Sequence, residues 1–286
     1  MSRIFEALQR SESERVEFSF PEPPSVAILD ADQKLTAEAK VEVTVKTDSH
    51  LEEFPSVEVA PAATSRLVSL TEKESLGAEK FRFLGVRLRR LQQERPLKKL
   101  LITSTLSGEG KSLVTANLAA TLARRKQQKV LLLEGDLRRP TQASLFGGSR
   151  PAGLSEWLQS KNPTVSNIYH LEGPGFWLMP AGHPPDNPLE LMQSGKLGEL
   201  LEQLTLWFDW IVIDSPPVMP LADTSVWARF ADGILLVVRA GRTERQALQR
   251  GLGAIEQSRL LGLVINNSTG NDEEDYYSRY SATAVE

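Results

Sequence analysis

A glycine-rich turn between an apolar run and a helix-forming segment constrains the fold of this chain more than any other stretch. The apolar residues 99–104 lead into the sequence TLSGEGKS at 105–112, and good helix formers follow. In a strand–loop–helix of this kind, backbone N–H groups and the positive end of the helix dipole converge on an anion. The pattern predicts a phosphate-binding loop in which Lys111 reaches the β- and γ-phosphates of a nucleotide and the Ser112 hydroxyl binds Mg²⁺.

The loop departs from the usual pattern G-x-x-x-x-G-K-[ST] at its first position, where Thr105 replaces glycine. An ordinary strand–turn–helix with an accidental Gly-Lys-Ser is the alternative interpretation. The apolar strand before the loop, the helix after it and the acidic strand ends downstream favour phosphate binding. The candidate nucleotide-binding residues of the loop are Ser107, Gly108, Glu109, Gly110, Lys111, Ser112 and Leu113.

Length and composition exclude several classes of protein. A chain of 286 residues gives a prior of about two domains. It has no cysteine, which excludes disulfides and thiolate metal sites. The net charge of −4 argues against nucleic acid as the main partner, and no apolar run approaches the ~18–20 residues that span a bilayer. We expect a cytoplasmic protein that reaches the inner membrane only peripherally, through a partner.

Three regions of the chain differ in composition. Residues 1–65 combine prolines with acidic and small residues and lack helical periodicity, so we expect a disordered segment there. Its start, at 3–15, is either a fraying tail or a short docking helix. Residues 66–270 carry the α/β pattern of a folded domain, beginning with an amphipathic helical pattern within 67–92. Residues 271–286 form a polar tail.

Apolar runs of strand length alternate with helical patterns through the folded region. Continuous Val, Ile and Leu runs are typical of parallel strands buried on both faces, and helices between them form right-handed crossovers. The sequence predicts an α/β fold, a doubly wound and mostly parallel sheet with helices on both faces and a ligand site at the carboxyl ends of the strands. The predicted strands are 99–104, 130–134, 176–179, 210–214, 233–239 and 262–266, and the predicted helices are 111–125, 189–206, 221–230 and 245–257.

Three carboxylates stand where two of these strands end. Glu134 and Asp136 are one residue apart, so they would point the same way from a continued strand. Asp214 follows an apolar run and precedes two prolines, which is the Walker B pattern. Opposite a phosphate loop, such groups can hold Mg²⁺ or accept a proton from an attacking hydroxyl. We predict catalytic roles for Lys111, Asp136, Glu134 and Asp214, and metal binding by Ser112, Asp136 and Asp214.

Together these motifs resemble the bacterial tyrosine kinases of capsule and exopolysaccharide systems, which are P-loop NTPases. The family's Walker A motif, its Walker A′ motif D-x-D-x-R and its Walker B ending D-S-P-P correspond to residues 104–112, 134–138 and 214–217. The resemblance covers about residues 70–286 and implies an ATP- and Mg²⁺-dependent protein-tyrosine kinase. The family phosphorylates a tyrosine cluster in its own tail, often that of a neighbouring subunit. Here the cluster consists of Tyr276, Tyr277 and Tyr280.

The resemblance also implies partners and a regulatory role. The family regulates polysaccharide polymerisation and export, and a membrane polysaccharide co-polymerase usually activates it. It assembles as a homo-oligomeric ring through a motif E-x-x-R-x-x-R, which here reads Glu79, Arg82 and Gly85, so the oligomeric state stays open. Asn266, at the end of the last predicted strand, resembles the adenine-contacting asparagine of related ATPases. A strand-end cap is the alternative role for this residue.

Two departures from the family leave other functions open. Glu134 replaces the first aspartate of Walker A′, and its extra methylene moves the carboxylate by roughly 1 Å, which can cost ~10²-fold in rate. With Gly85, this favours a catalytically weak kinase that acts by binding, in which Glu134→Asp would raise activity. A switch ATPase of the partition or division-site type shares the fold and the ATP site. Its loop carries a signature lysine where this chain has Leu106.

Overall fold

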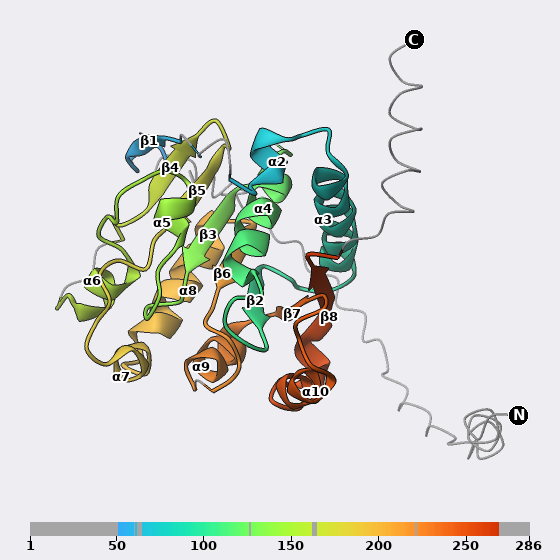
Figure 1. Ribbon diagram of the computed structural model, residues 1–286. Helices are drawn as coiled ribbons and strands as arrows, with labels where there is room; N and C mark the ends of the chain where they lie inside the picture. Colours follow the sequence, from blue (N-terminus) through green and yellow to red (C-terminus); the bar gives the residue numbers. More distant parts are fainter. Residues whose placement is uncertain are drawn as a thin grey trace, which may run out of the picture. The chain divides into compact units, whose positions relative to one another are not determined.

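The computed structural model describes residues 51–268 except 60, 62–64, 126, 162–164 and 221. The tail tyrosines, the segment 3–15 and most of the predicted disordered segment lie outside the described residues. The described part of the chain is an eight-stranded sheet with helices on both faces (Figure 1), which confirms the predicted fold class. Among the described residues, no helix is both long and apolar enough to cross a membrane.

The sheet is parallel except at one pair of strands. Its strands are β1 (Ser56–Glu58), β2 (Lys99–Ser104), β3 (Val130–Glu134), β4 (Tyr169–Glu172), β5 (Phe176–Met179), β6 (Trp210–Asp214), β7 (Gly233–Arg239) and β8 (Leu260–Asn266). They lie in the order β1-β4-β5-β3-β6-β2-β7-β8, and only β4 and β5 run antiparallel. Because β3, β6 and β2 are neighbours and parallel, the three strands that carry the phosphate loop and the acidic residues end at the same edge.

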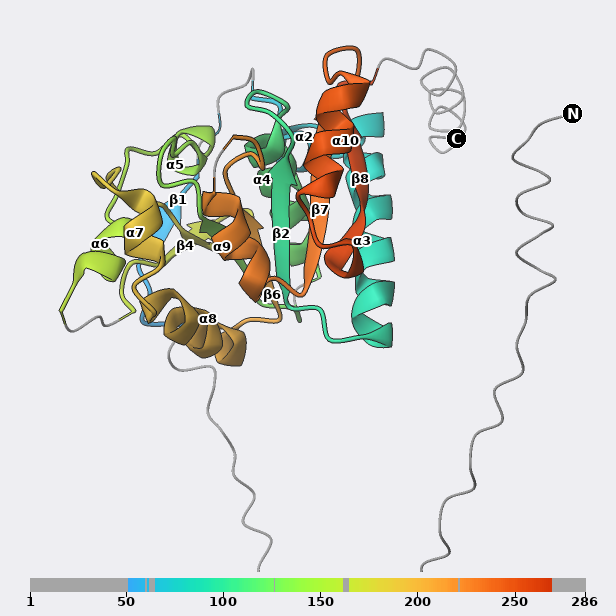
Figure 2. The same ribbon diagram turned by 90° about the horizontal axis from the view of Figure 1, so that it is seen from below.

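Helices cover the two faces of the sheet (Figures 1 and 2). One face carries α4 (Lys111–Ala123), on which α2 (Val68–Thr71) and α3 (Leu76–Glu94) pack, together with α5 (Gln142–Leu145). The other face carries α6 (Leu154–Gln159), α7 (Pro188–Met192), α8 (Lys196–Trp207), α9 (Asp223–Phe230) and α10 (Arg245–Gly253). A short 3₁₀ helix, Gln257–Arg259, precedes β8.

The central strands supply side chains to two separate cores, one on each face. In β2, Leu101 belongs to one core, whereas Leu100 and Ile102 belong to the other. In β6, Ile211 lies in the same core as Leu101, and Val212 lies in the core on the other face. None of these side chains is exposed. Each such burial stabilises the fold by about 1.5–3 kcal/mol. This is why these strands read as uninterrupted apolar runs in the sequence.

The predicted strands match the observed bounds more closely than the predicted helices do, since α4 and α10 end earlier, at Ala123 and Gly253, and α9 begins later, at Asp223. Five predicted strands coincide with β2, β3, β5, β6 and β7, whereas β8 begins two residues early, at Leu260. The predicted helix 189–206 is divided into α7 and α8, because Gly195 adopts a left-handed φ of 86° between them. The short helices α5 and α6 and the antiparallel strand β4 were not predicted.

The prediction of disorder throughout 1–65 is wrong for residues 51–59. Here β1 pairs in parallel with β4 at the edge of the sheet. Leu51 is 5% exposed, and the Phe54 ring lies 6.0 Å from that of Trp207. A three-residue strand has little local signal, and its backbone partners lie more than 100 residues away. Residues close to this segment in the sequence offer no apolar core, so the segment packs on residues that are distant in the sequence.

Gly85 is buried where α3 approaches α4. A Cβ at this position would lie 3.3 Å from Thr121 Cγ2, which is tighter than ordinary contact. The guanidinium of Arg89, one turn further on, donates to the carbonyl oxygens of Thr121 and Leu122, each at 3.2 Å. Arg89 thus caps the carboxyl end of α4 with a positive charge. The family's second arginine is therefore replaced at a site of close helix packing.

Candidate active site

The phosphate loop is shaped by two glycines in the left-handed region. Gly108 and Gly110 have φ values of 83° and 93°. A Cβ on Gly110 would lie 2.1 Å from Asn266 Nδ2, so that only glycine fits beside β8. The same Asn266 nitrogen donates to the carbonyl oxygen of Glu109 at 2.9 Å. Because α4 begins at Lys111 without a side-chain cap, its first N–H groups can bind an anion.

Side chains on the outer side of the loop hold its shape. Glu109 is 2% exposed, and its carboxylate accepts from the N–H of Leu106 at 2.8 Å and from the Thr243 hydroxyl. Thr105 turns away from the loop and packs on α10, where a Cβ on Gly251 would lie 2.9 Å from its hydroxyl oxygen. The departure from the usual first glycine is therefore accommodated by a glycine of α10.

Lys111 lies at the centre of the predicted catalytic residues. Its Nζ lies 2.9 Å from Asp136 Oδ2 and 3.2 Å from Ser112 Oγ. Asp214 Oδ1 lies 3.6 Å from the same nitrogen. Burial alone would lower the pKa of Lys111, but the charges of Asp214, Asp136 and Glu134 outweigh burial and raise it. Lys111 is therefore an ammonium at neutral pH, and the structure brings the predicted metal and catalytic residues together around it.

Gln142 joins two of these residues and was missed in the sequence. It is fully buried at the start of α5, and its Nε2 donates to Asp214 Oδ2 at 2.8 Å and to the carbonyl oxygen of Ser112 at 3.0 Å. Both partners are acceptors, which fixes the orientation of the amide. No local sequence signal distinguishes such a buried glutamine from a surface one.

Two buried oxygens of this network lack a hydrogen-bond donor among the described residues, namely Gln142 Oε1 and Asp214 Oδ1. Leaving a buried acceptor unpaired costs about 1–3 kcal/mol, and Asp214 Oδ1 has only the Lys111 ammonium at 3.6 Å. Asp214, Asp136 and the Ser112 hydroxyl all lie around Lys111, and hard oxygen ligands of this kind suit Mg²⁺ and its waters. The residues present therefore fit a magnesium ion.

Glu134 contacts the backbone of two loops. Its Oε1 accepts from the N–H groups of Thr141 and Gln142, and its Oε2 accepts from that of Ala181 at 2.9 Å. Burial raises the pKa of Glu134, the three N–H groups oppose this, and the Asp214 charge adds to it. The predicted catalytic carboxylate thus lies 1% exposed, with both oxygens bound to the main chain.

A cavity of about 580 Å³ opens beside Lys111 and Asp136. Its lining combines apolar side chains with charged side chains of the phosphate loop and of the segment after β3. Arg138 and Arg139 in this segment are both exposed, and Arg138 makes two hydrogen bonds to Asp223, at 2.6 and 3.1 Å. The lining residues are Leu106, Ser107, Gly108, Lys111, Asp136, Arg138, Arg139, Thr141, Pro217, Met219 and Pro220.

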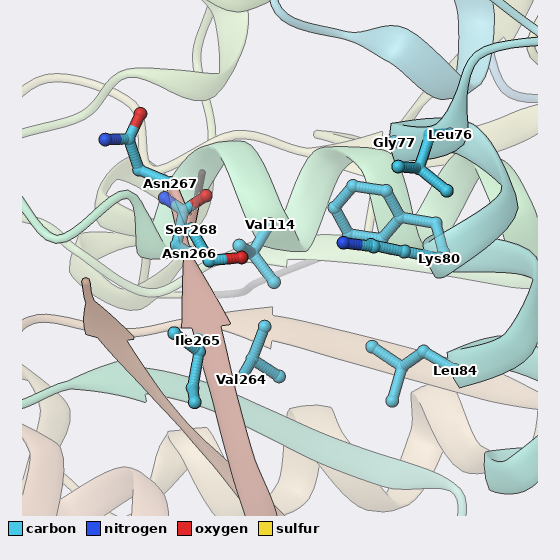
Figure 3. Close-up of a pocket in the computed structure, with 11 residues that line it drawn as sticks. Leu76, Gly77, Lys80, Leu84, Val114, Val264, Ile265, Asn266, Asn267 and Ser268 are labelled. Carbon is cyan, nitrogen blue, oxygen red and sulfur yellow. The ribbon is translucent and has the colours of Figure 1, made fainter. Parts of the chain in front are cut away.

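A second pocket, of about 250 Å³, lies between α3, α4 and the end of β8. Figure 3 shows Leu76, Gly77 and Lys80 of α3 across from Asn266 of β8, with Val114 of α4 between them. An adjoining cavity of about 310 Å³ continues to the phosphate loop and is also lined by Gly108, Gly110 and Leu113. A planar base could therefore lie beside Asn266 with its phosphates along the loop.

Comparisons with known proteins agree with this geometry. Residues 100–284 match the family CobQ/CobB/MinD/ParA nucleotide binding domain. Tyrosine-protein kinase YwqD of Bacillus subtilis (strain 168) is 32% identical over 217 residues, which cover 73% of this chain and 89% of that protein. The kinase domain of Escherichia coli tyrosine kinase ETK superposes with a TM-score of 0.66 at 30% identity, covering 71% of this chain and 82% of the other. The chimerical protein CapA2B2 gives 0.67 at 27% identity, covering 78% and 98%.

Proposed function

This chain belongs to the CobQ/CobB/MinD/ParA family of nucleotide-binding domains and is a bacterial tyrosine kinase, and we propose that it transfers the γ-phosphoryl group of ATP to its own C-terminal tyrosines. The observation that carries the proposal is the Lys111–Asp136 pair on the wall of a cavity of about 580 Å³. A reacting hydroxyl can enter there beside both a cation and a carboxylate. The proposed acceptors are Tyr276, Tyr277 and Tyr280.

The nucleotide would extend from the base pocket to this cavity. We place the adenine beside Asn266 and the triphosphate along the N–H groups of the loop and the start of α4. Ser112, Asp136 and Asp214 would hold Mg²⁺ or its waters. Mg²⁺, when bound, neutralises charge on the β- and γ-phosphates.

Phosphoryl transfer needs a base because the tyrosine hydroxyl has a pKa near ~10. The tyrosine oxygen forms a bond to the γ-phosphorus, the bond from that phosphorus to the bridging oxygen breaks, and ADP leaves. A bound γ-phosphate competes with Asp136 for the Lys111 ammonium, which leaves the carboxylate able to accept the tyrosine proton. Lys111 in turn stabilises charge on the transferring group.

Leu106 lies 39% exposed on the wall of the same cavity. A switch ATPase of the partition type carries its signature lysine at this position, whereas this chain offers an apolar contact for an aromatic ring. This supports the kinase over the switch. A catalytically weak kinase is the second alternative, and it was motivated by Glu134 in place of the family's aspartate and by Gly85. Because both oxygens of Glu134 bind backbone N–H groups, we assign it a positioning role and Asp136 the role of base.

Assembly and regulation follow from the family resemblance. We propose that the tail of one copy enters the cavity of another, and that a membrane polysaccharide co-polymerase activates the kinase at the cytoplasmic face of the membrane. Each phosphate adds about −1.5 to −2 charges to an already acidic tail. Repulsion then weakens tail docking, which would couple phosphorylation to polysaccharide polymerisation and export.

Phosphorylation mapping tests the proposal. The full chain is incubated with ATP and Mg²⁺, and phosphorylated residues are identified by mass spectrometry, with Lys111→Met as control. We expect phosphate on the three tail tyrosines and none in the control. Hydrolysis of ATP without any phosphotyrosine would support the switch ATPase instead.

A further inference from the structure

Two consecutive arginines beside the cavity differ in their surroundings. The Arg138 guanidinium is neutralised by Asp223, which is 1% exposed, through hydrogen bonds of 2.6 and 3.1 Å. The exposed Arg139 side chain makes no hydrogen bond or ion pair with any residue that the structure describes. Its backbone N–H donates to Asp136 Oδ1 at 3.1 Å, which fixes Arg139 beside the proposed base. Arg138 is therefore structural, whereas Arg139 presents an uncompensated charge.

The residues that line the cavity include three cations and one anion. Lys111 pairs with Asp136 at 2.9 Å and lies 3.6 Å from Asp214, and Arg138 pairs with Asp223. Arg139 is therefore the lining cation without a charged partner among the described residues. The lining also includes the apolar side chains of Leu106, Pro217, Met219 and Pro220. A cavity with apolar lining and one unpaired cation fits an aromatic ring whose chain neighbours are anionic.

The tail of the chain has this chemistry. Four acidic residues in a row, 272–275, directly precede Tyr276 and Tyr277. The fourth tyrosine of the chain, Tyr169, follows the uncharged residues 165–168 and lies in β4. Tyr276 and Tyr277, the two proposed acceptors that follow the acidic run directly, thus differ from Tyr169 in the charge that precedes them, whereas Tyr280 follows Arg279.

We propose that the cavity selects tyrosines preceded by acidic residues, and that Arg139 is the residue that recognises them. The inference rests on the proposed kinase function and specifies the substrate class of that site as an acidic tyrosine peptide. An exposed ion pair contributes modestly, and several acidic residues near one arginine give about a 5- to 10-fold preference. Because the contact is the same in the ground state and the transition state, the effect falls on KM rather than kcat.

A peptide experiment tests this assignment. The full chain with its three tail tyrosines replaced by phenylalanine phosphorylates either the peptide NDEEDYYSRY or the peptide NNQQNYYSRY, called neutral here because uncharged amides replace its four acidic residues. We expect a KM about 5- to 10-fold higher for the neutral peptide at equal kcat. Arg139→Gln should raise KM for the acidic peptide to the neutral value, and Arg139→Glu should reverse the preference. Arg150→Gln, which removes an exposed arginine outside the cavity, should change neither KM.

Other outcomes overturn the inference in distinguishable ways. An equal loss with both peptides in Arg139→Gln would show that Arg139 acts on the ATP phosphates. Equal KM values for both peptides with the unchanged arginine would show that charge is not recognised. Phosphorylation of neither peptide, together with no phosphotyrosine in the native tail, would overturn the proposed function itself.

Discussion

Two sets of polar side chains surround the phosphate site, and we call them the inner and the outer wall. They contain similar residue types but bind different partners. In the inner wall, Glu134, Gln142 and Asp214 are at most 1% exposed, and they are joined by hydrogen bonds to backbone groups and to one another. In the outer wall, Lys111 and Asp136 face the cavity and are held by an ion pair of 2.9 Å. Bonds to the backbone fix a shape, whereas an ion pair can be exchanged for a charged ligand. The contrast assigns positioning to the inner wall and chemistry to the outer one.

Replacement of Lys111 tests the outer wall with the largest expected effect. Lys111→Met should lower tyrosine phosphorylation by about 10³-fold, because it removes the cation that stabilises the transferring group. It also leaves the buried Asp136 and Asp214 without their cation, which should cost about 3–5 kcal/mol of stability near pH 7. Phosphate incorporation and denaturant unfolding measure the two effects. Lys111→Arg, which keeps the charge, should restore stability, and equal instability in both variants would contradict the ion-pair explanation.

Neutralising Glu134, at the end of β3, and Asp136, just after it, compares the two walls directly. Asp136→Asn should lower kcat by about 10²-fold, because it removes the proposed base. Glu134→Gln should lower kcat less, since the side chain contacts backbone groups rather than the cavity. Single-turnover phosphorylation of the tail measures both. Equal losses in the two variants would place Glu134 in the chemistry after all.

The sequence predicted the outer wall better than the inner one. Continuous apolar runs located β2, β3 and β6, and parallel strands bring the residues at their carboxyl ends together. The role of Glu134 was not predictable, because its partners Thr141 and Ala181 lie in two loops that only the fold brings together. Gln142 was missed for the same reason, and β1 because its pairing with β4 is remote in sequence. The acidic motif itself gave no sign of which carboxylate faces the cavity.

Gln142 provides a test of the inner wall that does not depend on turnover. Gln142→Leu removes the amide that orients Asp214 and the buried acceptor Oε1. Loss of such an outer-shell contact should weaken Mg²⁺ binding by about 10-fold. The measurement is the Mg²⁺ concentration that half-maximally promotes binding of a non-hydrolysable ATP analogue. Gln203→Leu, on the exposed face of α8, is the matched control, and an unchanged Mg²⁺ requirement in Gln142→Leu would refute the positioning role.

Shortening Glu134 separates the structural role from the catalytic one. The sequence suggested that Glu134→Asp would raise activity by restoring the family's aspartate. The structure predicts the opposite, because a shorter side chain cannot reach both the Thr141–Gln142 backbone and Ala181. We expect a loss of about 1–3 kcal/mol in the free energy of unfolding, from N–H groups left unpaired. Urea unfolding and tail phosphorylation of this variant, measured together, distinguish the two roles. Higher activity at unchanged stability would support the interpretation from sequence, in which Glu134 is a compromised catalytic carboxylate.

The smallest expected effect is a pH dependence that belongs to Glu134. Burial raises the pKa of this carboxyl group in the folded chain above its ordinary value of about 4.3. Its contribution to stability is therefore fully present below that ordinary value and is lost as pH rises through the folded pKa. Relative to Glu134→Gln, which does not titrate, the unchanged chain should lose stability as pH rises above the ordinary pKa of the carboxyl group and through its raised folded pKa. Unfolding midpoints measured across this range give the difference directly. A difference that is constant with pH would mean that the three backbone N–H groups fully offset the cost of burying the charge.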